Sequence, residues 1–175
     1  AEFAQLRDPA ALETYLARVT PAAESVRRIG AEIPAALPAQ IAQIRKALPD
    51  FALDGITIYV VPSFGHYNGR VRPVQGGLAL FLGPDGMVQG EGAHPNVART
   101  LAHELFHVYQ FQMHPDIDPS SATLWMATMG EGEAVYASQV ITGASMDDAL
   151  MSKEFGSAGV ATTKALACGI RDRAD

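Results

Sequence analysis

Four of the five histidines in this chain lie between positions 94 and 114, and two of them are four residues apart in the run His103-Glu104-Leu105-Phe106-His107. Residues four apart lie one above the other on the same face of an α-helix. Residues 96–113 carry apolar side chains at helical spacing and end before Pro115, so they predict a helix. Both imidazoles are therefore expected to reach one point beside that helix.

Few types of side chain in this sequence can serve as metal ligands. The chain has one cysteine, Cys168, which excludes an intramolecular disulfide and a zinc ribbon of the CxxC type. A bound metal must therefore use histidine, aspartate or glutamate, and Zn²⁺ accepts imidazole nitrogens. Glu104 lies about 100° round the helix from His103, beside such an ion. There it can take a proton from a water molecule whose pKa the zinc has lowered.

A third ligand must come from another segment, and the next predicted helix, 122–142, offers Glu131 and Glu133. These glutamates are two residues apart and point to different faces, so spacing alone leaves both open. His114 falls on the same stripe as His107 but about 10 Å further along the helix, too far to share its ion. The two other histidines, His66 and His94, are expected in loops.

Composition narrows the classes of partner. The 175 residues and 48% hydrophobic content fit one domain with a real core. The net charge is −6 and no basic stripe stands out, which argues against nucleic acid and anionic membrane as partners. No apolar run reaches the roughly 18 residues of a membrane span.

The chain divides by pattern into a helical N-terminal scaffold, 1–52, and a mixed region, 53–175. Pro34 and Pro38 are expected to interrupt the N-terminal part. The predicted helices cover 3–19, 21–33, 39–48, 96–113, 122–142, 146–154 and 157–168. The mixed region is expected to hold a buried strand at 56–61, a short strand at 71–74, a clear strand at 78–82 and a turn at 83–86. The whole is an α+β domain with a small central sheet.

The HExxH run, followed one helix later by Glu131-Gly132-Glu133-Ala134 (EGxA), resembles the gluzincin group of zinc metallopeptidases. In that group the glutamate of the second segment completes a His2Glu zinc site. The resemblance therefore implies that His103, His107 and Glu131 are zinc ligands and that Glu104 is the general base. It covers about residues 56–142 and implies a zincin-like fold for the 53–175 region.

Further features belong to the same resemblance. The segment 125–136 is similar to segments of small bacterial gluzincins, many of them exported, and the 78–82 strand resembles the edge strand along which such enzymes lay a peptide. Two features differ from thermolysin-like members: 24 positions separate His107 from Glu131, and Val135 replaces an aspartate. A residue that stabilises the oxyanion is also expected in this group. The sequence does not identify it and leaves Tyr67, Tyr109, Tyr136 or a residue outside this sequence as candidates.

The sequence therefore predicts a zinc-dependent peptidase acting on peptide or protein substrates. One alternative is a non-catalytic module of the same fold that binds zinc and an extended peptide. A second is a metal-free helical interaction domain in which the HExxH run arose by chance. The sequence leaves compartment and oligomeric state open, and export is an expectation that comes from the resemblance alone.

Overall fold

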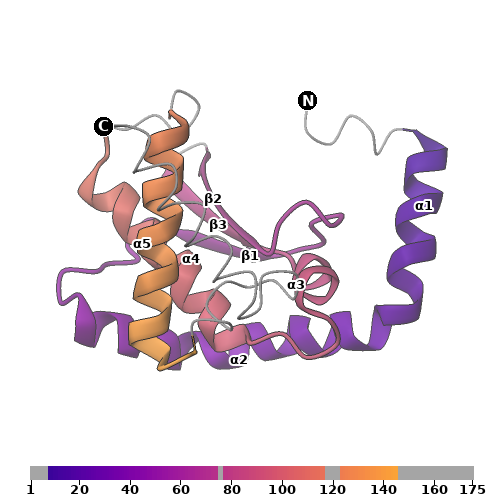
Figure 1. Cartoon of the computed structure of the whole chain (residues 1–175), viewed down its shortest axis with the longest axis horizontal. Coiled ribbons are helices and arrows are strands. Elements are labelled where there is room, and N and C mark those ends of the chain that lie inside the picture. The colour runs from indigo at the N-terminus through magenta and orange to yellow at the C-terminus, as the bar shows by residue number, and fades with distance from the viewer. Residues whose placement is uncertain (1–7, 75–76, 117–122, 146–175) are drawn as a thin grey trace, which may run out of the picture.

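The computed structural model describes residues 8–74, 77–116 and 123–145, which form helices around a small sheet (Figure 1). This confirms the α+β prediction. The elements are α1 (Pro9–Val19), the 3₁₀ helix η2 (Thr20–Ala22), α2 (Ala23–Ala47), β1 (Thr57–Val60), β2 (Gly69–Val74), β3 (Gly77–Leu82), α3 (Pro84–Glu91), α4 (Val97–Met113) and α5 (Leu124–Thr142). The helices predicted at 146–154 and 157–168, and Cys168, lie outside the described residues. Among the described helices, none is long and apolar enough to cross a membrane.

The three strands lie in the order β1-β3-β2, with β1 parallel and β2 antiparallel to β3. The prediction of a strand at 56–61 is right in position but wrong in burial, because Tyr59 and Val60 of β1 are exposed. Strand β1 is an edge strand, and Tyr59 stacks on Phe81 at 5.0 Å between ring centroids. A continuous run of β-branched and aromatic residues therefore marked a strand but could not tell an edge strand from an inner one.

Strand β3, the predicted 78–82 strand, is the central strand of the described sheet. Both of its edges are paired, so its expected role as the edge strand for a peptide is wrong. Strand β2, which includes the predicted 71–74 strand, is the edge strand on the other side. Its Val71 is buried and lies in one row with Leu80 and Ile58, on the sheet face that carries the core residues.

Helix α2 runs unbroken through Pro34 and Pro38, so the prediction of two separate helices is wrong. Both prolines are exposed, whereas the opposite side of the helix buries Ile29, Ile33 and Ile44 completely. The buried positions 29, 33, 40 and 44 keep helical spacing across both prolines. Tertiary packing of this stripe therefore outweighs the local cost of each proline, which is the loss of one backbone hydrogen bond and a ring close to the preceding turn.

The predicted turn at 83–86 is instead the first turn of α3, with Pro84 in the opening position that a helix tolerates. Gly86 serves packing rather than turning. A Cβ atom at this position would lie 1.9 Å from the carbonyl oxygen of Tyr67. The glycine-rich signal thus marks a place where two backbones meet closely.

Asp85 and Glu91, at the two ends of α3, tether the 61–68 segment that leads into β2. The Asp85 carboxylate accepts hydrogen bonds from the Ser63 and Gly65 amides at 2.7 and 3.1 Å and from the Tyr15 hydroxyl of α1 at 3.1 Å. Burial beside Asp85 raises the pKa of that tyrosine to about 12. These contacts hold the start of β2 in a fixed place.

Glu91 joins the same segment to the start of α4. It forms a buried ion pair with Arg99, and the Asn68 side chain donates to its other oxygen at 3.5 Å. The Asn96 side chain caps α4 at the Arg99 amide. The first turn of α4 is therefore fixed relative to the strand that lies beside it.

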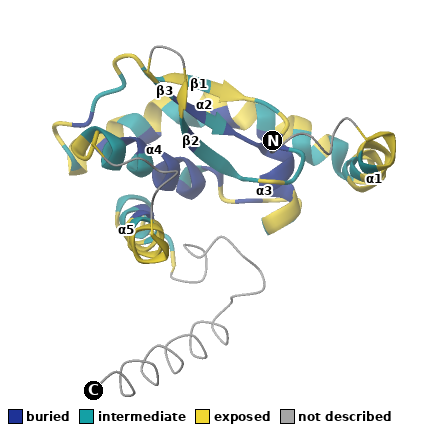
Figure 2. Ribbon diagram, turned by 90° about the horizontal axis from the view of Figure 1, so that it is seen from above, coloured by how far each residue is buried: buried dark blue, intermediate teal, exposed yellow. Residues whose placement is uncertain are grey.

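Helix α4 confirms the prediction for 96–113 and lies at the centre of the described fold, between α5 and the elements that carry the rest of the core (Figures 1 and 2). Its apolar residues Leu101, Ala102, Leu105 and Val108 are fully buried, as their spacing predicts. Helix α5 begins at a Thr123 cap and ends at left-handed Gly143, close to its predicted bounds.

If α2 is continuous, replacing Pro34 by alanine should restore the backbone hydrogen bond to Gly30 and raise the free energy of unfolding by about 1–3 kcal/mol. Pro21→Ala is the matched control, because Pro21 lies in the opening turn of η2, where its missing N–H costs nothing. Urea denaturation would measure both variants. A loss of stability in Pro34→Ala would contradict a continuous helix, since prolines in true breaks stabilise by stiffening the unfolded chain.

Candidate metal centre

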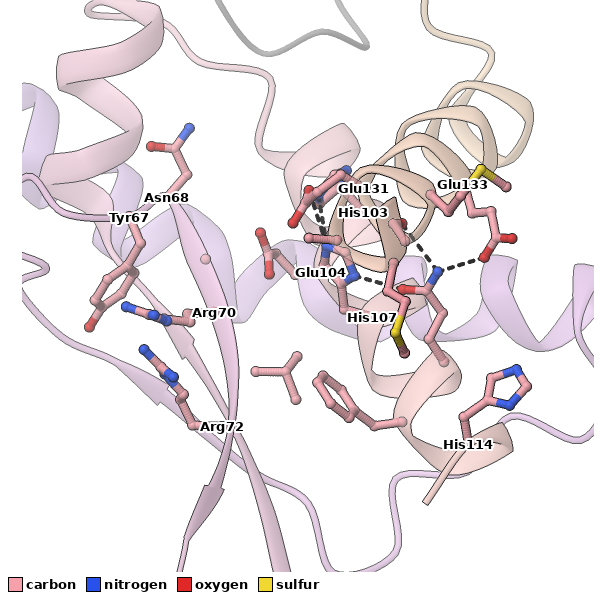
Figure 3. A pocket seen from close by; sticks show the side chains of 18 of the residues that line it. Tyr67, Asn68, Arg70, Arg72, His103, Glu104, His107, His114, Glu131 and Glu133 are labelled. Carbon is pink, nitrogen blue, oxygen red and sulfur yellow. Dashed lines mark hydrogen bonds and ion pairs between the residues drawn. The ribbon is translucent and has the colours of Figure 1, made fainter. Parts of the chain in front are cut away.

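Three side chains from two helices converge at one point on the side of α4 that faces α5 (Figure 3). His103 and His107 come from α4 and Glu131 from α5. The two histidine Nε2 atoms are 3.1 Å apart, and a single Glu131 oxygen lies 3.2 Å from the first and 3.4 Å from the second. Each residue thus offers one ligand atom, and the three atoms form a nearly equilateral triangle.

The dimensions of this triangle match those of a metal site. Zinc binds histidine nitrogen and carboxylate oxygen at about 2.0–2.2 Å in tetrahedral geometry, which separates neighbouring ligand atoms by about 3.3 Å. The three observed separations lie within 0.2 Å of that value. The donor set of two imidazoles and one carboxylate therefore fits Zn²⁺ in both chemistry and spacing.

The electrostatics of the triangle also call for a cation. Hydrogen bonds with the two histidines hold the pKa of Glu131 well below its usual range, so its carboxylate is charged. Burial lowers the pKa of His103, against the hydrogen bond to Glu131. Burial also opposes charge on His107, but its hydrogen bond to Glu131 and the charge of Glu104 raise its pKa overall. A proton on His107 or a metal ion would meet the same need.

Glu104 lies beside the triangle without joining it, as its place on the helix predicts (Figure 3). The residue is 5% exposed, and burial raises the pKa of its carboxyl to about 7, opposed by His107 and helped by Glu131. Gly69 of β2 lies against it: a Cβ atom there would be 2.3 Å from the Glu104 side chain. The absence of a side chain at position 69 therefore makes the room that this carboxyl occupies.

Gln110, one turn after His107, connects the two helices at the site. Its side-chain oxygen lies 2.8 Å from Nδ1 of His107. Its amide nitrogen donates to the Gly130 carbonyl at 3.1 Å and to the Glu133 carboxylate at 2.8 Å, both on α5. The pairing of α4 with α5 that brings Glu131 to the histidines is thus reinforced by polar contacts one turn away.

The site opens into a cavity of about 850 Å³ lined by β2, α4 and α5. One part of the lining is polar and holds the triangle and Glu104. The other part carries the apolar side chains of Phe111, Trp125, Met126 and Met129. Among the residues that the structure describes, Trp125 is 68% exposed, so this apolar wall is accessible to a molecule that enters the cavity.

The structure distinguishes the predicted site residues from one another. Glu131 contacts both histidines, whereas its rival Glu133 contacts Gln110. His114 ends α4 and lines the cavity outside the triangle, as its spacing predicts. His66 and His94 are exposed in loops. Of the four clustered histidines, two therefore belong to the candidate site.

The three tyrosines proposed for the oxyanion do not gather at the triangle. Tyr109 donates to the Asp50 carboxylate at 3.2 Å, and the Tyr136 side chain is mostly exposed on α5. Tyr67 lines the cavity, but its ring lies across β2 from the histidines, beside Arg70 and Arg72 (Figure 3). None of these three is therefore positioned as an oxyanion partner in this arrangement.

Gly69 and Gln110 are parts of the site that the sequence did not single out. Gln110 falls on the stripe of His103, His107 and His114, and its three-residue spacing from His107 was the available signal. The role of Gly69 depends on its close approach to Glu104, a long-range contact that no local sequence pattern reveals.

Comparison with known proteins gives no family or relative: no model of a protein family, no curated protein and no solved structure matches the chain.

The raised pKa of Glu104 predicts that the free energy of unfolding of the metal-free protein depends on pH. The folded state holds this proton up to about pH 7 and the unfolded state only to about 4.5. Below about pH 4.5 both states are protonated and the full stability is present. Stability falls as pH rises from there, and the loss is complete once pH has passed about 7. Glu104→Gln should therefore gain stability relative to the parent chain across that range, by about 3 kcal/mol in total.

Denaturation of both chains from pH 4 to pH 9 in a chelator measures this difference. The subtraction removes groups that titrate alike in the two chains. A difference in unfolding free energy that stays constant with pH would contradict the raised pKa.

Proposed function

We propose that this protein is a zinc-dependent metallopeptidase with a His2Glu site of gluzincin type in a zincin-like domain. The proposal rests on one observation above the others. The three ligand atoms of His103, His107 and Glu131 lie at tetrahedral separations, with a buried carboxyl, Glu104, beside them. The HExxH and EGxA segments carry these four residues in the order that the resemblance requires.

Zinc held by His103, His107 and Glu131 would supply a Lewis acid, which polarises a carbonyl and lowers the pKa of water. Glu104 takes a proton from the attacking water and delivers it to the departing amine nitrogen. Gly69 keeps the carboxyl free of a steric neighbour at this point.

The shape and chemistry of the cavity favour a peptide substrate. Strand β2 forms one wall and is an edge strand of the described sheet. An extended peptide adds to such an edge through main-chain hydrogen bonds. The apolar wall of Phe111, Trp125, Met126 and Met129 suits side chains of that peptide. The strand proposed to bind an extended peptide is therefore β2, in place of the 78–82 strand.

The alternative is a zinc- and peptide-binding module of the same fold without turnover. The position of the tyrosines favours this alternative, because Tyr67, Tyr109 and Tyr136 leave the oxyanion without a partner from the predicted set. Both readings need the same metal and differ in cleavage. A diverse peptide library incubated with the zinc-loaded protein separates them by mass spectrometry of the products.

The third ligand can be tested with neighbouring glutamates on the same helix. Glu131→Ala should lower zinc affinity by more than the roughly 10–100-fold that loss of a hydrogen bond beside a ligand costs. Glu133→Ala should lower it by less than about tenfold, since Glu133 contacts Gln110 and not the histidines. Competition with a chromophoric chelator measures both. The reverse order of effects would exchange the two assignments.

The general base can be tested by removing only its charge. Glu104→Gln should keep one zinc per chain and lower kcat for peptide cleavage by about 10²–10⁴. Glu24→Gln is the matched control, because it removes the same charge from an exposed position on α2. Full activity in zinc-loaded Glu104→Gln would refute the assignment of the base.

A further inference from the structure

The amide of Gln110 has one orientation that its neighbours permit. Its nitrogen end faces the Gly130 carbonyl and the Glu133 carboxylate, which only accept hydrogen bonds. Two acceptors at 3.1 and 2.8 Å require the NH2 group on that side. The oxygen end must then face Nδ1 of His107, at 2.8 Å.

This orientation decides where His107 carries its proton. An amide oxygen accepts and cannot donate, so Nδ1 of His107 must be the N–H donor of that bond. In a neutral imidazole the proton on Nδ1 leaves Nε2 with a free lone pair. Nε2 is the atom that lies in the triangle with His103 and Glu131. When His107 gives up the Nε2 proton that faces Glu131, the neutral tautomer that remains is therefore the one that binds a metal.

The two histidines differ in this support. Nδ1 of His103 is buried and has no hydrogen-bond partner among the described residues. Among the described residues, His107 is therefore the ligand whose tautomer a hydrogen bond selects.

We propose that Gln110 is a positioning residue that locks His107 in the Nδ1-protonated tautomer, and that Gly130 and Glu133 fix the orientation of its amide. The proposal rests on the metal-binding part of the proposed function and is independent of peptide cleavage. It also assigns a role to Glu133, which lies two residues from Glu131 on α5 and contacts Gln110.

The direct test is the proton position in the zinc-free protein. Long-range ¹H–¹⁵N correlation spectra at alkaline pH distinguish a proton on Nδ1 from one on Nε2. Wild type should show His107 protonated on Nδ1, and Gln110→Met should show mixed or Nε2-protonated His107. An Nε2 proton on His107 in wild type would overturn the proposal, whatever the protein does to peptides.

Zinc affinity is the second readout. Gln110→Met should weaken zinc binding by about 10–100-fold. Gln112→Met is the matched control: it removes a glutamine from the same helix whose amide donates to the Ala52 carbonyl, away from the site. The control should leave the His107 tautomer and the zinc affinity unchanged even if it lowers stability. Equal affinities for the two variants would overturn the proposal.

A side-chain exchange separates positioning from general packing. Gln110→Glu alone places a carboxylate against Glu133 and the Gly130 carbonyl, so it should bind zinc less tightly than wild type. Adding Glu133→Gln returns an amide donor to that contact and leaves a carboxylate oxygen for Nδ1 of His107. The double variant should therefore recover zinc affinity and the Nδ1 tautomer. Failure of the exchange to improve on Gln110→Glu would count against the proposed contact chain.

Discussion

The burial of two ionisable side chains on one helix is the constraint on which the rest of the described structure depends. His103 and Glu104 are 3% and 5% exposed, next to Leu101, Ala102 and Leu105, which are fully buried. Burying such groups without partners costs several kcal/mol. Glu131 of α5 is the partner of the two histidines. Gly69 of β2 leaves room for the Glu104 carboxyl, whose pKa burial raises to about 7. This constraint explains the surroundings of α4. Its apolar face packs into the core, and its polar face is enclosed by α5 and β2.

Contacts from the surrounding elements fix the positions of β2 and α5 beside α4. Asp85 ties the segment before β2 to α3 and α1, and Glu91 ties the end of α3 to Arg99 of α4. These buried contacts lie outside the triangle, yet they decide where Gly69 meets Glu104. On the other side, Gln110 joins α4 to α5. The proposed chemistry therefore depends on fixed relations between strand and helix that extend beyond the ligands.

The sequence predicted those parts of the site that follow from helical spacing. The four-residue step from His103 to His107, the offset of Glu104 and the exclusion of His114 need only the geometry of one helix. Residues whose roles come from contacts across the fold could not be found this way. Gly69 matters because β2 brings it against Glu104, and Gln110 matters because it bonds to Gly130 of α5. No local periodicity describes such contacts between elements. The prediction of a break at Pro34 and Pro38 was wrong for the same reason, since packing against distant elements keeps α2 continuous through them.

The central claim is that one zinc ion occupies the triangle on α4 and α5. Anomalous scattering at the zinc edge from crystals of the zinc-loaded protein tests it most directly. The account predicts a single strong peak bonded to Nε2 of His103, Nε2 of His107 and one carboxylate oxygen of Glu131. A peak elsewhere, such as at Glu133 and His114, or no peak under saturating zinc, would contradict it.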